Sequence, residues 1–190
     1  MQVISITSFE QWRTEARQLL GAEVPPTEVS LVDGSAAQGA LDFGGASDRS
    51  EVSGGTPRYQ VPRSFLSLAR HVECHRHAAR WNLLYQVLWR LTHGESQLLQ
   101  ITTDDDVHQL KGWQQQVRRD AHKMKAFVRF RRTEIDGREW YVAWYRPDHR
   151  IVGLVAPFFA DRFSSNSRCF VEECEDPSLR VHHSNIVLVR

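Results

Sequence analysis

Basic side chains crowd one stretch of the chain, residues 111–132. This stretch contains eight lysines and arginines and one acid, a local charge of +7 on a chain whose net charge is +1. Phosphate oxygens suit this chemistry, because arginine offers two parallel donors and each neutralised phosphate releases counterions. The spacing alone leaves two interpretations open, a solvated charged face or a site for phosphate or nucleic acid. The basic residues are Lys111, Arg118, Arg119, Lys123, Lys125, Arg129, Arg131 and Arg132.

A predicted helix carries the first half of this stretch and a predicted strand carries the second. Helical spacing of i, i+4 and i+7 places Arg118, His122 and Lys125 along one side of the helix. The strand period of two places Arg129 and Arg131 on one face. We therefore expect a helix end and a strand face to form one basic surface, whose nucleic-acid contacts are Arg118, Arg119, His122, Lys123, Lys125, Arg129 and Arg131.

His122 has neighbours that suit general acid–base chemistry. Together with Asp120 it could move a proton beside a phosphate, while the surrounding cations stabilise developing charge. Residues two apart on a helix point to different sides, which argues against a direct dyad of these two side chains. Catalysis by His122 and Asp120 therefore stands as an alternative to phosphate binding. No Walker-type loop, dinucleotide glycine motif or nucleophile elbow occurs in the sequence.

Two further sets of residues could bind a ligand. Tryptophans 113, 140 and 144 could stack on bases, although core packing or pairing across the hairpin is the stronger interpretation. Histidines and cysteines could ligate a metal, but they lack the ordered spacing of a closed zinc site, so we predict no metal and no cofactor. Those residues are Cys74, His75, His77, Cys174, His182 and His183.

The N-terminal residues predict a small β-α-β element over 1–33. Ser8 with Gln11 forms a capping-box signal for a helix that runs to about Leu20, between strands near 3–6 and 27–32. Residues 34–58 are dense in Gly, Ala, Ser and Asp and predict a flexible linker. We expect this linker to tether the small N-terminal element to the rest of the chain.

Residues 59–163 predict the remaining ordered part. Three helices are expected, one to about His75, one over 77–92 that stops at His93-Gly94, and one capped by Thr103. A hairpin that turns at Asp136-Gly137 follows, and then a helix that Pro147-Asp148 opens. The fold class is therefore α+β, a helix-rich single domain with a small N-terminal β-α-β element and a C-terminal β-hairpin plus helix.

Composition indicates a reducing compartment. The three cysteines follow no tight disulfide spacing, and the N-terminus has no basic segment followed by an apolar one. No run approaches the ~18 apolar residues of a membrane span. We therefore expect a cytoplasmic protein without a membrane partner.

Several strings resemble a bacterial family of unknown function that is associated with DNA metabolism and DNA repair. The most extensive is residues 117–131 (VRRDAHKMKAFVRFR), and the others are 59–66 (YQVPRSFL), 84–91 (LYQVLWRL), 143–149 (AWYRPDH), 156–159 (APFF) and 162–163 (RF). Members of that family occur beside a radical-SAM protein or fused ahead of a uracil-DNA-glycosylase-like domain. The resemblance implies an accessory module that binds DNA and presents it to one of these partners. A docking surface for a repair enzyme, without DNA affinity, is a further alternative.

The resemblance covers residues 1–163, and 59–163 form the expected family core. Residues 164–190 lack the tryptophan-containing strand and Thr-Pro turn of the family and are expected to be a divergent tail. Our hypothesis is a frameshifted or rearranged gene end, which would also explain why no glycosylase-like domain follows. Resequencing that gene end tests the hypothesis.

Overall fold

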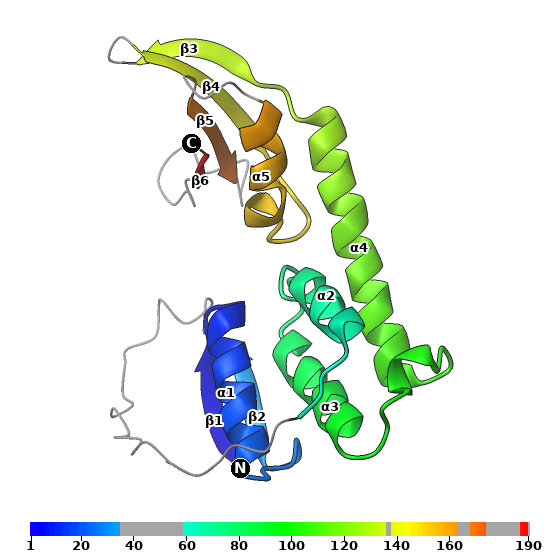
Figure 1. Cartoon of the computed structure of the whole chain (residues 1–190). Coiled ribbons are helices and arrows are strands. Elements are labelled where there is room, and N and C mark those ends of the chain that lie inside the picture. Colours follow the sequence, from blue (N-terminus) through cyan, green and yellow to red (C-terminus); the bar gives the residue numbers. More distant parts are fainter. Residues whose placement is uncertain (35–58, 136–137, 163–167, 174–186, 190) are drawn as a thin grey trace. The chain divides into compact units, whose positions relative to one another are not determined.

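The computed structural model describes residues 1–34, 59–135, 138–162, 168–173 and 187–189 (Figure 1). Its helices and two small sheets confirm the predicted α+β class. The chain divides into two compact units, which we call unit 1 (1–73 and 77–112) and unit 2 (74–76 and 113–190). The predicted linker over 35–58, the turn at Asp136-Gly137 and the candidate ligands Cys174, His182 and His183 lie outside the described residues.

Unit 1 begins with the predicted β-α-β element. Strands β1 (Gln2–Ile6) and β2 (Val29–Asp33) pair in parallel, and α1 (Phe9–Gly21) connects them. The Ser8 hydroxyl accepts a hydrogen bond from the Gln11 backbone N–H at 3.2 Å, which confirms the predicted cap. The apolar face of α1 contributes Trp12, Ala16 and Leu20 to the core of this unit.

The N-terminal element is built into the core of unit 1 together with α2 (Arg63–Val72) and α3 (Arg80–Thr92). The Trp12 ring stacks on Trp81 at 6.3 Å between centroids, and its Nε1 donates to the Trp81 carbonyl at 3.2 Å. Asn82 Oδ1 accepts from the Leu31 N–H at 2.7 Å. The element that the sequence predicts as a tethered piece is therefore held by contacts with residues 50 to 70 positions further along the chain.

The ends of two helices show how local chemistry sets their bounds. Gly94 follows α3 with φ of +109°, a conformation that favours glycine and ends the helix where the sequence predicts. A short 3₁₀ turn (Leu98–Gln100) leads to α4 (Asp105–Phe127). The predicted cap Thr103 is wrong, because Asp104 Oδ1 accepts from the Val107 N–H at 3.1 Å and takes that role.

Unit 2 consists of the second half of α4, a four-stranded sheet and one further helix. Its sheet has the order β3 (Arg131–Ile135), β4 (Arg138–Tyr145), β5 (Arg168–Glu173), β6 (Val187–Val189), and β4 and β5 run parallel. The antiparallel pair β3–β4 confirms the predicted hairpin, and α5 (Val152–Arg162) confirms the helix after it. The predicted start of that helix is wrong, because α5 begins at Val152 and not at Pro147-Asp148. Sequence patterning is weak beyond Phe163, yet β5 and β6 form there.

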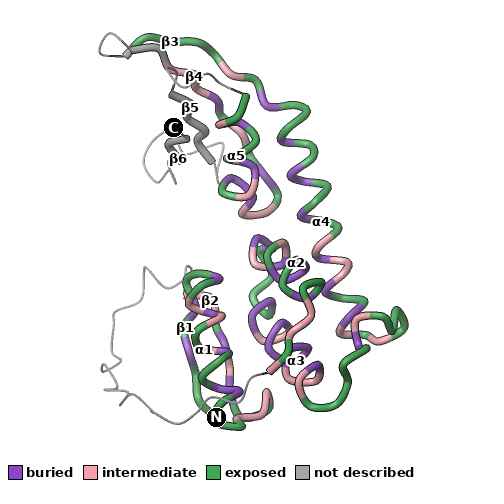
Figure 2. The backbone as a smooth tube through the Cα atoms, viewed as in Figure 1, coloured by how far each residue is buried: buried purple, intermediate pink, exposed green. Residues whose placement is uncertain are grey.

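The core of unit 2 joins α4, β4 and α5. Its buried members include Val117 and Met124 of α4, Ala143 of β4, and Val155 and Phe159 of α5. Burial alternates along α4, so that one side is covered and the rest is exposed (Figure 2). This packing fixes which side chains of the basic stretch face solvent.

Candidate nucleic-acid interface

One flank of α4 carries a row of basic side chains. Successive helical residues turn by about 100°, so Arg118, His122 and Lys125 lie within one narrow sector beside the buried stripe. All three are exposed. The expectation that they share one side of a helix is therefore consistent with the described geometry. We call these three residues the α4 row.

Two other predicted contacts lie on a different flank of α4. The same helical geometry turns Arg119 and Lys123 by about 100° away from the α4 row. Lys123 Nζ lies 4.0 Å from Asp148 Oδ2, and both side chains are mostly exposed. The predicted surface is thus divided between two flanks of α4. The α4 row lies on the flank whose last member, Lys125, is near the C-terminal end of the helix.

Arg129 is placed differently from the prediction. Helix α4 ends at Phe127, the Val128 N–H still donates to the Met124 carbonyl at 3.0 Å, and β3 begins only at Arg131. Arg129 therefore does not share a strand face with Arg131. Its guanidinium donates instead to the carbonyls of Ala126 and Val128, at 3.2 and 3.3 Å. A cation in this position satisfies carbonyl groups that the helix leaves free at its C-terminus.

Lys111 does not belong to this surface. It lies in unit 1, where its Nζ donates to the Leu99 carbonyl at 3.0 Å. Its charge contributes to the +7 of the sequence stretch but is used to hold the turn before α4. The strand residues Arg131 and Arg132 are exposed at the start of β3.

A pocket of about 310 Å³ opens at the end of the α4 row. Three basic side chains line it, Lys125 from α4, Arg129 from the connection and Arg162 from the last turn of α5. The Lys125 ammonium also lies 4.9 Å from the ring centroid of Phe158. We call this hollow the α4–α5 pocket, and its full lining is Lys125, Ala126, Val128, Arg129, Phe130, Tyr141, Phe159 and Arg162.

The candidate acid–base pair separates into two environments. Asp120 is only 3% exposed, and its Oδ2 accepts from the His149 backbone N–H at 2.8 Å. Burial raises the pKa of Asp120 above its ordinary value, although the hydrogen bond from His149 opposes the shift. His122 is exposed on the α4 row. Asp120 thus holds the loop before α5 in place, and the geometry supplies no His122–Asp120 dyad.

The candidate metal ligands around Cys74 are used for packing. His75 is buried between two rings, at 5.0 Å from Trp113 and 4.3 Å from His149, and its Nε2 lies 2.9 Å from Gln116 Oε1. The Cys74 carbonyl accepts from the Arg150 N–H at 2.8 Å. Among the described residues, no group of three or more His, Cys, Asp or Glu side chains is arranged to hold a metal ion.

The three tryptophans fall into different positions. Trp113 is buried and stacks on His75, so it is used for packing, as predicted. Trp140 pairs with Thr133 across the hairpin and is partly buried. Trp144 is 61% exposed. It lies in the part of β4 after the residues that pair with β3, and it pairs with Glu172 of β5. The prediction of core packing or hairpin pairing is therefore wrong for Trp144, which the structure leaves open to solvent.

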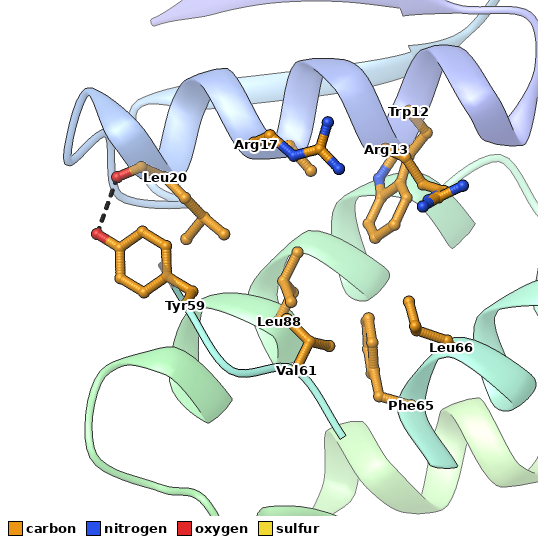
Figure 3. A pocket seen from close by; sticks show the side chains of 10 residues that line it. Trp12, Arg13, Arg17, Leu20, Tyr59, Val61, Phe65, Leu66 and Leu88 are labelled. Atoms are coloured by element: carbon orange, nitrogen blue, oxygen red, sulfur yellow. Dashed lines mark hydrogen bonds between the residues drawn. The ribbon is translucent and has the colours of Figure 1, made fainter. Parts of the chain in front are cut away.

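Unit 1 contains a larger hollow that the sequence did not indicate. It measures about 540 Å³ and lies against α1 and α2, with Trp12, Phe65 and Leu88 among its walls (Figure 3). Arg13 and Arg17 of α1 also line it. The Tyr59 hydroxyl donates to the Leu20 carbonyl at 3.1 Å and closes one end.

Within the described residues, no helix combines the length and the apolar character needed to cross a membrane.

Comparison with known proteins gives one family. No curated protein and no solved structure matches the chain. The family described as a domain of unknown function, DUF4130, matches residues 78–178. The matched region includes α3, α4, the β3–β4 hairpin, α5 and β5, and it extends beyond Phe163. Since this match covers more than half of the 190-residue chain, the chain belongs to the DUF4130 family.

Proposed function

We propose that unit 2 binds the phosphate backbone of DNA and acts as an accessory module for a DNA-processing enzyme. The observation that carries the proposal is the α4 row, three basic or titratable side chains exposed on one helix flank that ends in a pocket lined by two further arginines. Such a surface offers charge to phosphates without requiring any particular base sequence. The resemblance to proteins associated with DNA repair supports DNA as the source of the phosphates.

The charge balance of this surface supports the proposal. The one acid within residues 111–132, Asp120, is buried and bonded to the loop before α5. The positive charge of the α4 row is therefore not neutralised by an exposed acid within residues 111–132. From Arg118 to Lys125 the row extends roughly 10 Å along the helix axis. At about 3.4 Å of axis per phosphate, this length matches roughly three phosphates of one strand.

The test is DNA binding across a salt series. Fluorescence anisotropy with labelled single-stranded and duplex oligonucleotides, with and without uracil, should show binding that weakens steeply as salt rises. The variant Arg118→Glu with Lys125→Glu reverses the α4 row, and we expect it to lose binding at least ~100-fold. Arg129 is left unchanged, because its guanidinium also satisfies the end of α4.

Two matched double variants give the controls. Arg119→Glu with Lys123→Glu changes the net charge equally on the other flank of α4, and Arg17→Glu with Arg70→Glu changes it equally in unit 1. Binding that falls only for the α4 row assigns the interface to that flank. Equal losses for all three pairs would reduce the effect to net charge, and the assignment would fail. No binding to any DNA at low salt would refute the proposed function.

A further inference from the structure

The α4–α5 pocket combines cations with aromatic walls. Lys125, Arg129 and Arg162 supply positive charge, while Phe130, Tyr141 and Phe159 supply rings. Cations bind phosphate, and rings stack on bases of every sequence because each base has a flat π-face. Backbone binding along the α4 row accounts for Lys125, but it explains neither the two arginines nor the rings. A ligand that uses both must carry negative charge and a flat apolar surface on the same small molecule or segment.

Packing holds these walls in place before any ligand binds. Phe130 meets Phe159 edge to face, at 5.1 Å between centroids and 64° between planes, and Phe159 is buried in the core of unit 2. Tyr141 comes from the middle of β4, where it pairs with Arg132 of β3 and Cys169 of β5. Arg129 is fixed by its bonds to the Ala126 and Val128 carbonyls. Fixed walls reduce the ordering cost of binding.

The size and position of the pocket select among such ligands. Its volume of about 310 Å³ lies at the lower end of the ~300 to 1,000 Å³ typical of small-molecule sites, which suits one nucleotide rather than several. Lys125 belongs to both the α4 row and the pocket lining. A strand held by the row would therefore bring its next nucleotide to the pocket. A paired base could not enter, because it stays stacked in the duplex.

We infer that the α4–α5 pocket takes up one unstacked nucleotide of a DNA single strand. Its base lies against Phe130 and Tyr141, and Lys125, Arg129 and Arg162 bind the phosphates beside it. This inference rests on the proposed function, because the α4 row delivers the strand. It adds a specific consequence, namely that the protein contacts bases as well as backbone and prefers single strands or unpaired positions over a fully paired duplex.

The test compares a strand with bases and a strand without them. The probes are a labelled nine-nucleotide oligothymidine and a nine-unit backbone of the same charge whose sugars carry no bases. Wild-type protein should bind the oligothymidine more tightly by roughly 5- to 150-fold, the range expected for one stacked base. Ala126→Leu fills the pocket with a non-aromatic side chain and changes no charge. It should bind both probes equally, at the affinity of the base-free backbone.

Further variants make the result specific. Ala78→Leu is the matched control, since Ala78 is an exposed alanine of unit 1, and it should keep the wild-type preference. Tyr141→Leu removes one aromatic wall without filling the pocket, and it should also lose most of the preference for the oligothymidine. It therefore provides the test if Ala126→Leu does not fold. Circular dichroism establishes that each variant is folded before binding is measured.

The outcomes separate the two proposals. If wild-type protein binds both probes equally and in a salt-dependent manner, the pocket inference is overturned and the proposed function survives. If Ala126→Leu and Tyr141→Leu both keep the preference for bases, stacking occurs elsewhere and the pocket inference is again overturned. If wild-type protein binds neither probe at low salt, the proposed function itself fails, and the inference fails with it.

Discussion

The two units use arginine in different ways. In unit 1, the guanidinium nitrogens of Arg80 and Arg90 lie 2.7 to 2.8 Å from carboxylate oxygens. These ion pairs connect one element of the unit to another. In unit 2, Arg118 and Arg119 are exposed on a helix whose single nearby acid in sequence is buried and bonded elsewhere. Arg80 and Arg90 thus stabilise unit 1, whereas Arg118 and Arg119 of unit 2 offer their charge to solvent. An abundance of arginine in a sequence therefore does not by itself indicate a binding surface.

The ion pairs of unit 1 differ in burial. Arg80 is 2% exposed, its Nη1 donates to Asp33 Oδ2 at 2.8 Å, and its guanidinium lies 4.6 Å from the Trp81 ring. Arg90 is partly exposed and reaches three carboxylates, those of Glu95, Asp104 and Asp106. Hydrogen bonds from Arg90 hold the pKa values of Glu95 and Asp104 below their ordinary range. These contacts join α3 to β2 and to the start of α4.

The largest effect on stability should come from the buried pair. Arg80→Met keeps the apolar stem but leaves the Asp33 carboxylate without its guanidinium in a buried position. We expect the free energy of unfolding to fall by about 3–5 kcal/mol, measured by denaturant unfolding. Arg80→Met combined with Asp33→Leu removes both charges and should recover part of the loss. A loss below ~1 kcal/mol for Arg80→Met would contradict the statement that Arg80 stabilises the structure of unit 1.

Charge reversal in unit 2 should separate binding from stability. Arg118→Glu with Lys125→Glu should reduce the slope of log affinity against log salt by about 1.4 for single-stranded DNA, since each phosphate contact contributes about 0.7. The free energy of unfolding should change by less than ~0.5 kcal/mol per substitution, as for exposed positions without structural contacts. A large loss of stability would show that these cations are structural, as in unit 1.

Disrupting the ion-pair network at Arg90 should reduce stability by less than disrupting the buried Arg80–Asp33 pair. Arg90→Met leaves three acids close together at the junction of α3 and α4, and we expect a loss of about 1–2 kcal/mol by thermal or denaturant unfolding. Glu95→Gln removes the most exposed acid of the network and should cost less. If Glu95→Gln were as damaging as Arg90→Met, repulsion among the remaining acids would not explain the effect.

The smallest effect concerns Glu73, an acid of unit 1 whose pKa rises to about 7 mainly because it is buried. Its ordinary value is 4.5, so between pH 4.5 and about 7 the folded chain holds the proton that the unfolded chain has lost. Its contribution to stability therefore falls as the pH rises through this window. Glu73→Gln should raise the melting temperature at pH 8 relative to wild type and leave it unchanged at pH 4.5.

The control for this pH effect is Glu28→Gln, at an exposed position of the same unit. Scanning fluorimetry between pH 4.5 and 8 should give the same pH profile for Glu28→Gln as for wild type. A profile of Glu73→Gln that is also parallel to wild type would show that Glu73 titrates alike in the folded and unfolded chains.

Short-range signals in the sequence predicted much of the fold. The Ser8 cap and the stop at Gly94 each depend on residues within a few positions of one another, and each forms as predicted. The β3–β4 hairpin also pairs as predicted, although its first strand begins at Arg131 and leaves out Arg129. The helical spacing of the basic stretch likewise predicted that Arg118, His122 and Lys125 lie along one side of α4, and all three are exposed there.

The tertiary structure decided the rest, because it depends on residues that are distant in the chain. Packing against α3 made the N-terminal element part of a core, and the hydrogen bonds at the end of α4 took Arg129 out of the predicted strand. The α4–α5 pocket draws Lys125, Tyr141 and Arg162 from a helix, a strand and another helix. Periodicity and capping report only on neighbours a few residues apart, so no local pattern could have placed these three side chains around one hollow.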